Sequence, residues 1–439
     1  MGDYMFMMES HLSADQFRLV GQMQEIAGAA GVGLYLTGGA VRDMLTGNPV
    51  RDLDFTIEGP ALKIAKTAAQ KLGGEILSSD ESRKSAELRF PGGVTAEIGM
   101  AHTERFAKSG ARPQITAATI HEDLRTRDFT INAIAFSLNK ASLALLIDPA
   151  NGVGDLERKE IRAIHNYSFY DEPSRMLRMV RFRIRMGYAL DERTKLQYEN
   201  SREADMLSRI TPEALRAELI HISAEPLVHD VIQALDQEKM LTPFAPLLMG
   251  GKLNTADLLK LQKARQMVPF GSGIDIDGLS LLLTVLSSNW NAKETAAFSK
   301  ASGLVKGDWT AVQKLSTAAK KLDRDLKNPK LQKPSQLYTL LQKTPGEHIL
   351  HAAVYSAERV VHDRIKNYFQ KYLAMADEVT DEMVAAAGAP KGSPKFAKTR
   401  SDLILKHLDA RPKKVPPPPE PPPPPTSAFA RGPIRRAGM

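Results

Sequence analysis

Hydrophobic and polar residues follow two different periods along the first 145 residues of the chain. Stretches with a helical period are separated by short apolar runs that are typical of β-strands. This alternation predicts an α/β head in which helices accompany a mixed sheet. The helical stretches are residues 13–30 and 63–72, and the strand-like runs are residues 34–37, 53–57, 75–78, 86–90 and 94–100.

The pattern changes after the head. From Glu172 to about Asp409 nearly every segment has the spacing of an amphipathic helix, interrupted by short segments that contain proline or glycine. We therefore predict an all-α region there. Nine of the ten residues at 416–425 are proline and basic residues flank them, which predicts an extended polyproline II tail. Such a tail is as compatible with a spacer as with a binding role.

Composition narrows the class of protein. The chain has 439 residues, of which 25% are charged, and its formal net charge of +8 favours a polyanionic partner. The absence of cysteine excludes disulfides, thiolate zinc sites and cysteine nucleophiles, and suits a reducing compartment. No apolar stretch reaches the roughly 18 residues of a membrane helix, and the N-terminus has no signal-peptide pattern. We expect a cytoplasmic protein that does not associate with a membrane.

A compact group of polar residues lies in the sequence LTGGAVRDMLTGNPVRDLDFTIE at residues 36–58. Gly38 and Gly39 end an apolar run and precede helix-forming residues, so their amides can approach phosphate oxygens at a helix N-terminus. Arg42 stands one turn into that helix and can add a charged fork to the same phosphates. The spacing therefore predicts a triphosphate site.

Asp52 and Asp54 stand two residues apart at the next strand-like run. Side chains at this spacing share one face of a strand, with roughly 7 Å between their backbone positions. Two such carboxylates can hold Mg²⁺ ions about 4 Å apart. A glycine pair alone is usually a turn, and an aspartate pair alone is usually solvated. Their order and proximity favour a combined nucleotide and metal site.

A second cluster lies in HEDLRTRDFTINAIAFSL at residues 121–138. Arg127, Asp128 and Asn132 precede what we predict to be a helix whose apolar face is formed by residues 131, 134, 135 and 138. These polar residues could serve only as helix caps. Alternatively, Arg127 and Asp128 could bind a phosphate and a ribose hydroxyl, which need a cation and an acceptor side by side.

A third cluster lies in YDEPSRMLRMVRFRIRMGY at residues 170–188. Arg175, Arg178 and Arg181 follow one side of a predicted helix, and Glu172 is placed to pair with Arg175 at i, i+3. A basic stripe of this kind is usually a solvated surface. A Glu–Arg pair, however, presents an acceptor and donors that can read the edge of a nucleobase.

Together the three clusters resemble the class II tRNA nucleotidyltransferase and bacterial poly(A) polymerase family, which includes the CCA-adding enzymes. The resemblance covers roughly residues 30–190. It rests on ordered motifs: GGAVRD, DLD, EDLRTRDFTINAIA, DPANGVGDLERKEIRAI at 148–164, and DEPSRMLRMVRF.

The resemblance implies a role for each predicted site residue. Asp52 and Asp54 would be catalytic and would bind Mg²⁺, with Glu97 as a candidate third metal ligand, although an edge-strand glutamate is an equally good description of Glu97. The residues implied to bind the nucleotide are Gly38, Gly39, Arg42, Arg127, Asp128, Asn132, Glu172, Arg175, Arg178 and Arg181.

The family fold implies four regions in this chain. They are a nucleotidyltransferase head (palm) at 1–147, a neck for base selection at 148–205, an all-helical body and tail for tRNA binding at 206–410, and a disordered, proline-rich basic tail at 411–439.

The implied activity is template-independent addition of CCA, or part of it, to the 3′ end of tRNA from CTP and ATP, with release of pyrophosphate. Alternatives are a bacterial poly(A) polymerase and an enzyme that adds only CC or only A. The basic IGRRF-like segment expected of the poly(A) branch is missing between Asp54 and His121. Glu172 stands where the family commonly has aspartate, and Thr126 stands where many members have arginine. The glutamate moves the acceptor oxygens by one methylene and affects the choice between CTP and ATP.

Two readings from other classes remain open. A protein that kept the fold but lost chemistry would bind RNA only, although retention of Asp52 and Asp54 argues against this. An HD phosphohydrolase is suggested by His229-Asp230 and His362-Asp363. These pairs lack a clear flanking histidine and distal aspartate, so local hydrogen bonding is the simpler explanation.

Overall fold

The computed structural model describes residues 2–110, 112–245, 248 and 252–410. The predicted proline-rich tail at 411–439 lies outside the described residues. The chain divides into two compact units. The first comprises residues up to 332 together with 336–374, and the second comprises 333–335 and the residues from 375 onward.

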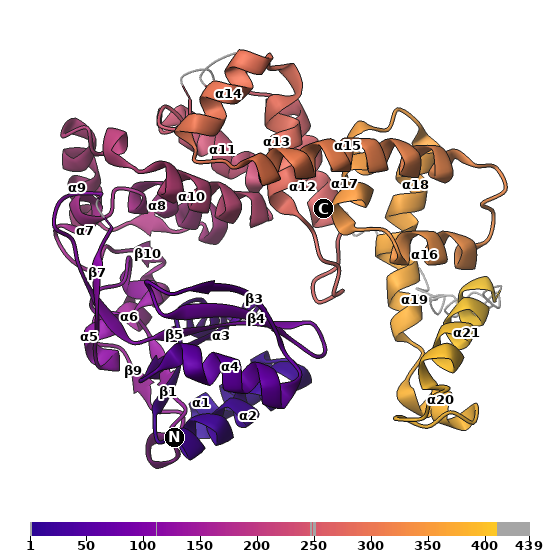
Figure 1. Cartoon of the computed structure of the whole chain (residues 1–439), viewed down its shortest axis with the longest axis horizontal. Helices are drawn as coiled ribbons and strands as arrows, with labels where there is room; N and C mark the ends of the chain where they lie inside the picture. The colour runs from indigo at the N-terminus through magenta and orange to yellow at the C-terminus, as the bar shows by residue number, and fades with distance from the viewer. Residues whose placement is uncertain (1, 111, 246–247, 249–251, 411–439) are drawn as a thin grey trace, which may run out of the picture. The chain divides into compact units, whose positions relative to one another are not determined.

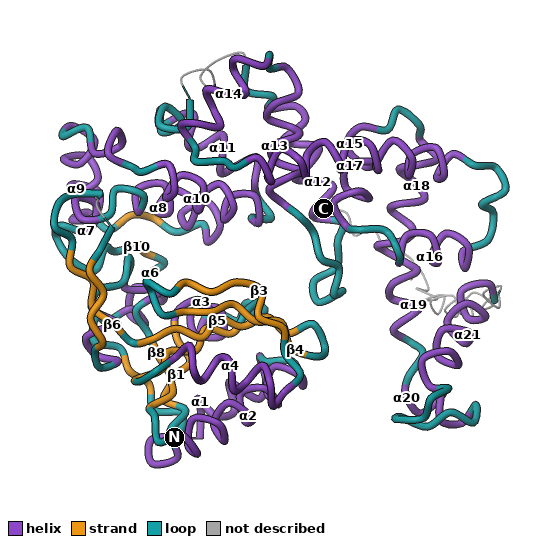
Figure 2. The backbone as a smooth tube through the Cα atoms, in the orientation of Figure 1, coloured by secondary structure: helices purple, strands orange, loops and turns teal. Residues whose placement is uncertain are grey.

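A seven-stranded mixed sheet forms the centre of the N-terminal part of the first unit (Figure 1, Figure 2). The strand order is β3-β4-β5-β2-β1-β8-β9, in which β2 and β5 run parallel and the other neighbours run antiparallel. The strands are β1 (Gly33–Thr37), β2 (Leu53–Glu58), β3 (Glu75–Asp80), β4 (Ser85–Phe90), β5 (Val94–Met100), β8 (Ala135–Ser137) and β9 (Leu146–Ile147).

Helices α2 (Ala14–Ala30) and α4 (Ala61–Leu72) pack against each other and against this sheet (Figure 1). Helix α2 begins where predicted, because Ser13 and Gln16 form a capping box, and it ends at Gly31, whose φ is +66°. The other helices of this part are α1 (Gly2–His11), α3 (Gly38–Leu45), α5 (Ile120–Leu124) and α6 (Gly152–Arg158).

The sheet positions the polar residues of β2 by alternation. Leu53, Phe55 and Ile57 are fully buried in the core, whereas Asp54 and Thr56 line a cavity. The alternative description of Glu97 as an edge-strand residue is wrong, because β5 lies between β4 and β2.

The helix predicted after residue 130 is also wrong. Residues 130–132 form a 3₁₀ turn and residues 135–137 form β8, which pairs with β1 and β9. All residues from 128 to 138 are buried, so this segment has no solvent-exposed face. A short apolar run that is buried on both sides has no period that separates a strand from a helix, and pairing with β1 decided the outcome.

Between β5 and β8 the head also contains a separate strand pair, β6 (His102–Arg105) with β7 (Gln114–Ala117). After α6 the described chain is helical apart from one short strand pair, β10 (Glu160–Ile161) with β11 (Ala189–Leu190). The fold class predicted from the sequence is therefore confirmed. The helices of this remainder in the first unit are α7 (Ser168–Asp171), α8 (Arg175–Met186), α9 (Glu192–Glu203), α10 (Pro212–Ala224), α11 (Val228–Gln237), α12 (Thr255–Gln266), α13 (Gly278–Leu286), α14 (Ala292–Ala301), α15 (Lys306–Lys327), α17 (Gly346–Tyr355) and α18 (Arg359–Asn367).

Along the sequence, the boundaries between the two units fall within helices α16 (Pro334–Gln342) and α19 (Leu373–Asp377). A π-helical turn at Tyr368–Tyr372 precedes α19. In the second unit, α20 (Asp381–Ala386) packs against α21 (Phe396–Asp409). None of the helices in the described ranges has the length and apolarity needed to span a bilayer.

Gly152, the first residue of α6, provides a test of the packing beneath the cavity. A Cβ atom at this position would lie 2.1 Å from the carbonyl oxygen of Thr130, so the backbone would have to move. We expect Gly152→Ala to reduce the free energy of unfolding by about 3 kcal/mol, measured by urea denaturation. Gly21→Ala is the matched control, because its Cβ would meet no atom within 4 Å and α2 should gain about 0.5–1 kcal/mol. Equal stability of the two variants would contradict the packing described here.

Candidate active site

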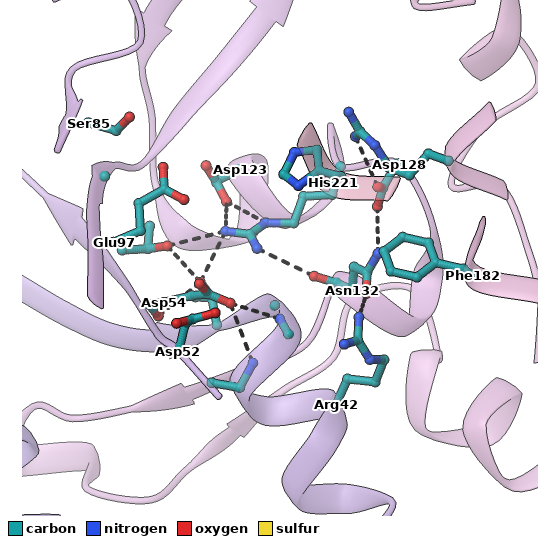
Figure 3. Close-up of a pocket in the computed structure, with 18 of the residues that line it drawn as sticks. Arg42, Asp52, Asp54, Ser85, Glu97, Asp123, Asp128, Asn132, Phe182 and His221 are labelled. Atoms are coloured by element: carbon teal, nitrogen blue, oxygen red, sulfur yellow. Dashed lines mark hydrogen bonds and ion pairs between the residues drawn. The ribbon is translucent and has the colours of Figure 1, made fainter. Parts of the chain in front are cut away.

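A cavity of about 540 Å³ opens between the sheet and helices α8 and α10. The segments that line it come from the turn between β1 and α3, from β2 and β5, from residues 123–132, and from α8 and α10. Every predicted site residue contributes to its wall, and Figure 3 labels some of them. These residues are Gly38, Gly39, Arg42, Asp52, Asp54, Glu97, Arg127, Asp128, Asn132, Glu172, Arg175, Arg178 and Arg181.

The glycine pair forms the junction of β1 and α3. Gly38 has a φ of +62°, and a Cβ on it would lie 3.0 Å from Arg127 Nη1. The amides of Gly39 and Ala40 donate to Asp54 Oδ2 at 3.0 and 3.4 Å. The amides at the start of α3 therefore hold the carboxylate of Asp54, an anionic group inside the cavity. Their binding to a phosphate stays a prediction.

Three carboxylates lie together on the sheet side of the cavity. Asp54 and Glu97 are direct register partners on the parallel strands β2 and β5, and Asp52 precedes β2 by one residue (Figure 3). Asp52 is exposed and accepts a hydrogen bond from the hydroxyl of Thr95. Burial, followed by the charges of Glu97 and Asp52, raises the pKa of Asp54 to about 7.

This donor set is chemically suited to a hard divalent cation. Carboxylate oxygens are the ligands that Mg²⁺ prefers, and a cation would favour the charged form of Asp54, which burial and then the charges of Glu97 and Asp52 disfavour. Within the described part of the chain, however, no three His, Asp or Glu side chains already converge as a complete metal cage. Asp52 and Asp54 are held by Thr95 and by the α3 amides.

Arg42 lines the cavity, but it is almost completely buried. Its Nη1 donates to Asn132 Oδ1 at 2.6 Å, and its other nitrogens pair with Asp43 at 2.8–2.9 Å. Asn132 donates in turn to Asp128 at 3.0 Å, which extends the chain of polar contacts across the site (Figure 3). The structure thus brings Arg42, Asn132 and Asp128 together, although 90 residues separate the first two.

Arg127 lies against Gly38 and faces the carboxylates. Its Nε donates to Asp123 at 3.0 Å, and its Nη2 donates to the hydroxyls of Thr37 and Thr56 at 3.2 Å. The sequence interpretation missed Asp123, Thr37 and Thr56. The only signal available was the i, i+4 spacing of Asp123 and Arg127.

The predicted pair between Glu172 and Arg175 forms, with Arg175 Nε 3.0 Å from Glu172 Oε2. The remaining Arg175 nitrogens donate to the Ser168 hydroxyl at 2.9 Å and to the carbonyls of Thr126 and Arg127 at 3.1 and 3.3 Å. Arg175 is only 3% exposed, so its donors are already engaged in holding α8 to the head.

Arg178 and Arg181, the other two arginines of α8 that we predicted in the site, are bound by acidic residues of the head, of α10 and of the loop that follows α10. Arg178 contacts Asp128 and Glu218 at 3.1 Å, and Arg181 contacts Glu218 at 3.3 Å and Glu225 at 3.1 Å. The alternative of a solvated basic stripe is therefore wrong for α8. Its acidic partners could not be identified from sequence spacing.

The two HD pairs occupy separate helices. His229 contacts Asp230 at 2.8 Å, and Asp230 accepts from Gln262 at 2.9 Å. His362 contacts the carbonyl of Ser356, and Asp363 pairs with Arg359. No described residue joins either pair as a third metal ligand, so local contacts account for both.

Comparison with known proteins gives consistent matches. Residues 34–162 match the family model of the poly(A) polymerase head domain. An A-adding tRNA nucleotidyltransferase of Halalkalibacterium halodurans is 32% identical over 296 residues, which are 65% of this chain and 66% of that protein. A CCA-adding enzyme of Lactobacillus delbrueckii subsp. bulgaricus is 32% identical over 198 residues, which are 44% of this chain and 47% of that protein. The chain thus spans less than two thirds of the length of each relative.

A solved structure gives the same fold. The Thermotoga maritima CCA-adding enzyme complexed with tRNA has a TM-score of 0.51 and 24% sequence identity, with coverage of 93% of this chain and 95% of that one.

Glu218 connects two arginines and so provides a test of the charge network. Burial alone would raise its pKa, but Arg181 and Arg178 lower the pKa below its ordinary value. A carboxyl group whose pKa is lower in the folded state than in the unfolded state stabilises the fold. This stabilisation is fully present at pH values above the unfolded pKa of about 4.3, and it is lost as the pH falls through the folded pKa. We expect Glu218→Gln to reduce the free energy of unfolding by about 3–5 kcal/mol at pH 7.

Urea denaturation at pH 7 and pH 4 measures this effect, and the difference from wild type should shrink at the lower pH. Glu213→Gln, an exposed position on the same helix, should change stability little at either pH. A difference for Glu218→Gln that does not vary with pH would show that charge is not responsible.

Proposed function

Because the chain belongs to the class II tRNA nucleotidyltransferase and poly(A) polymerase family, we propose that it adds CCA, or part of it, to the 3′ end of tRNA without a template. CTP and ATP are the nucleotide substrates and pyrophosphate is released. One observation carries the proposal: the carboxylates of Asp52, Asp54 and Glu97 share a cavity with the amides of Gly39 and Ala40. A nucleotide needs such an arrangement, with anion donors beside acidic metal ligands.

Asp52 and Asp54 are the catalytic residues of this proposal and would hold Mg²⁺, with Glu97 as the third candidate ligand. When bound, the metal would favour ionisation of a hydroxyl and neutralise charge on the leaving group. The 3′ oxygen of the RNA forms a bond to the α-phosphorus, the bond to pyrophosphate breaks, and the hydroxyl proton leaves to solvent. No covalent enzyme intermediate is required.

The nucleotide's phosphates and sugar would contact the head residues of the cavity. Gly38 has no side chain to block an anion, and Arg127 supplies positive charge next to it. The amide of Gly39 holds Asp54 and would turn to the anion only if Asp54 moved to bind a metal. Asp128 and Asn132 would position the sugar. Arg42 would hold Asn132 in position by donating a hydrogen bond to its side chain.

The base would be selected by the residues before and within α8. Glu172 and Arg178 retain 19% and 25% exposure of their side chains, so both can meet a base edge. Arg175 would fix the position of Glu172, since its own donors are engaged. Arg181 would hold Arg178 in place through the shared contact with Glu218.

The helical remainder would bind tRNA by its shape and its phosphates, because A-form RNA conceals its base edges in a deep groove. The named relatives act on tRNA, which supports this assignment. A tRNA substrate together with the lack of cysteine favours a cytoplasmic location.

A double substitution tests the catalytic assignment. Asp52→Ala with Asp54→Ala should lower incorporation of labelled CTP and ATP by at least about 1,000-fold, because both metal-binding carboxylates are lost. Affinity for tRNA, measured by filter binding, should not fall. Glu213→Ala serves as the control carboxylate, and unchanged turnover in the double variant would refute the site.

A second candidate function is addition of A only. It is favoured by the A-adding relative and by Glu172, which stands where the family commonly has aspartate. Because the longer side chain moves the acceptor oxygens, it can change which base edge fits.

Sequencing of the products separates these candidates. With RNA that lacks CCA, we expect CTP and ATP together to yield ends in CCA. Addition to RNA ending in CC from ATP, with no use of CTP, would establish the A-only function. ATP homopolymers on unrelated RNA would instead defeat the tRNA assignment. Glu172→Asp should alter the ratio of kcat/KM for CTP and ATP by about tenfold, as expected for a shift of one methylene.

A further inference from the structure

A second cavity, of about 850 Å³, lies next to the candidate active site. Its wall comes from β3, β4 and the turn between them, from β7 and the loop before it, from residues 171–174 and from α10. The two cavities share part of their walls, including Arg83, Glu97, Glu172 and His221, and Figure 3 labels Glu97 and His221. A ligand in the second cavity would therefore lie beside both the candidate metal ligand Glu97 and the candidate base reader Glu172.

The charges of the second cavity differ from those of the first. Arginines are nearly as many as carboxylates along the wall of the first cavity, whereas carboxylates clearly outnumber arginines along the wall of the second. A triphosphate, with its several negative charges, therefore fits the first cavity better. The second cavity better suits a ligand with little charge and several hydrogen-bond donors, such as the ribose hydroxyl and the base of one nucleotide in an RNA strand.

The side of α10 that lines the second cavity carries short side chains. Ala214 and Ala217 stand there one turn apart, and Thr211 directly precedes the helix. Small side chains leave room for a planar ring, and a cavity of this volume is within the range that binds small-molecule ligands. The second cavity can therefore hold a nucleotide against α10.

His221 lies where the two cavities meet, since it lines both of them. It is exposed and forms no hydrogen bond or ion pair with a residue that the structure describes. It stands on α10 one turn beyond Ala217, so its ring belongs to the same side of the helix as the two alanines. An exposed aromatic ring without a polar partner can stack on a nucleobase.

We propose that the second cavity binds the terminal nucleotide of the RNA strand that carries the attacking 3′ hydroxyl, with His221 stacked on its base. This inference rests on the proposed function and deepens it. The ribose of that nucleotide would lie beside Glu97, and its base would lie next to the incoming base at Glu172. Arg112 is exposed on the same wall and has no ion pair with a described residue, so it can meet the phosphate that precedes this nucleotide.

Ala217→Leu tests whether RNA needs the space of the second cavity. Leucine has a helix propensity close to that of alanine, so this exposed position should keep its fold. We expect kcat/KM for an RNA that lacks CCA to fall about tenfold, because the larger side chain occupies part of the site. KM for CTP and ATP should stay within about twofold. Ala297→Leu is the matched control and should leave all values unchanged, since Ala297 is exposed on α14 and lines neither cavity.

Substitutions of His221, combined with an RNA that lacks its terminal base, test the stacking. With intact RNA, His221→Ala should lower kcat/KM for RNA about tenfold, and loss of the base should have the same effect on the wild type. The two losses should not add, because both remove the same contact. His221→Phe should stay within about threefold of the wild type, since phenylalanine can stack but cannot form a hydrogen bond. An equal loss in His221→Phe and His221→Ala would overturn the inference.

A binding measurement without nucleotide separates this inference from the proposed function. RNA with 2-aminopurine as its 3′-terminal base loses fluorescence when that base stacks. We expect saturating wild type to quench the fluorescence, and His221→Ala and Ala217→Leu to restore it.

Each remaining outcome has one meaning. If the wild type adds nucleotides but both variants quench the fluorescence as the wild type does, the second cavity does not bind the RNA end. If Ala217→Leu raises only KM for CTP or ATP, the cavity binds the free nucleotide and the inference is wrong. If the wild type adds no nucleotide yet the variants restore the fluorescence, the proposed activity fails and the RNA site stands.

Discussion

The guanidinium group of Arg178 is bound by three carboxylates from separate parts of the chain. Asp128 follows α5 in the head, Glu172 precedes α8, and Glu218 lies on α10, with contacts of 3.1–3.4 Å. Removal of any one partner leaves charge that water cannot fully solvate, which makes the arrangement cooperative. The cavity depends on this interaction because it joins the wall that carries the RDFTIN segment to the wall that carries α8.

The two sides of the cavity carry opposite charge. Carboxylates of β2 and β5 gather on the sheet side, while arginines of α8 and the preceding loops face them. A nucleotide with its metal ions has the same division, since its phosphates are anionic and the metals are cationic. The free protein therefore holds like charges close together, and burial first and then the charges of Glu97 and Asp52 raise the pKa of Asp54.

Selection between nucleotides would depend on how firmly Glu172 is positioned. Its two oxygens accept from Arg175, Arg178 and Ser174 at 3.0–3.4 Å. A carboxylate held at three points can discriminate between base edges by geometry, because rearrangement to fit the wrong base would break existing bonds. Glu172 has a longer side chain than the aspartate that is common at this position. Because its oxygens are held in place, the extra methylene would shift the position at which they meet a base.

The local sequence determined several structural features of the head and of α8. The glycine junction at 38–39, the paired positions of Asp52 and Asp54, the capping box at Ser13 and the Glu172–Arg175 pair all follow from spacings of four residues or fewer. Such features depend on backbone geometry that neighbouring residues impose, so the sequence alone sufficed to predict them.

Tertiary structure decided what depends on distant partners. Residues 135–137 became a strand because β1 and β9 offered hydrogen bonds on both sides, although their apolar pattern also fitted a helix. The same holds for the partners of Arg178 and Arg42, which lie 40 and 90 residues away in Glu218 and Asn132. Burial and charge pairing at such separations arise only when the chain folds, because no periodic pattern in the sequence records which distant surfaces will meet.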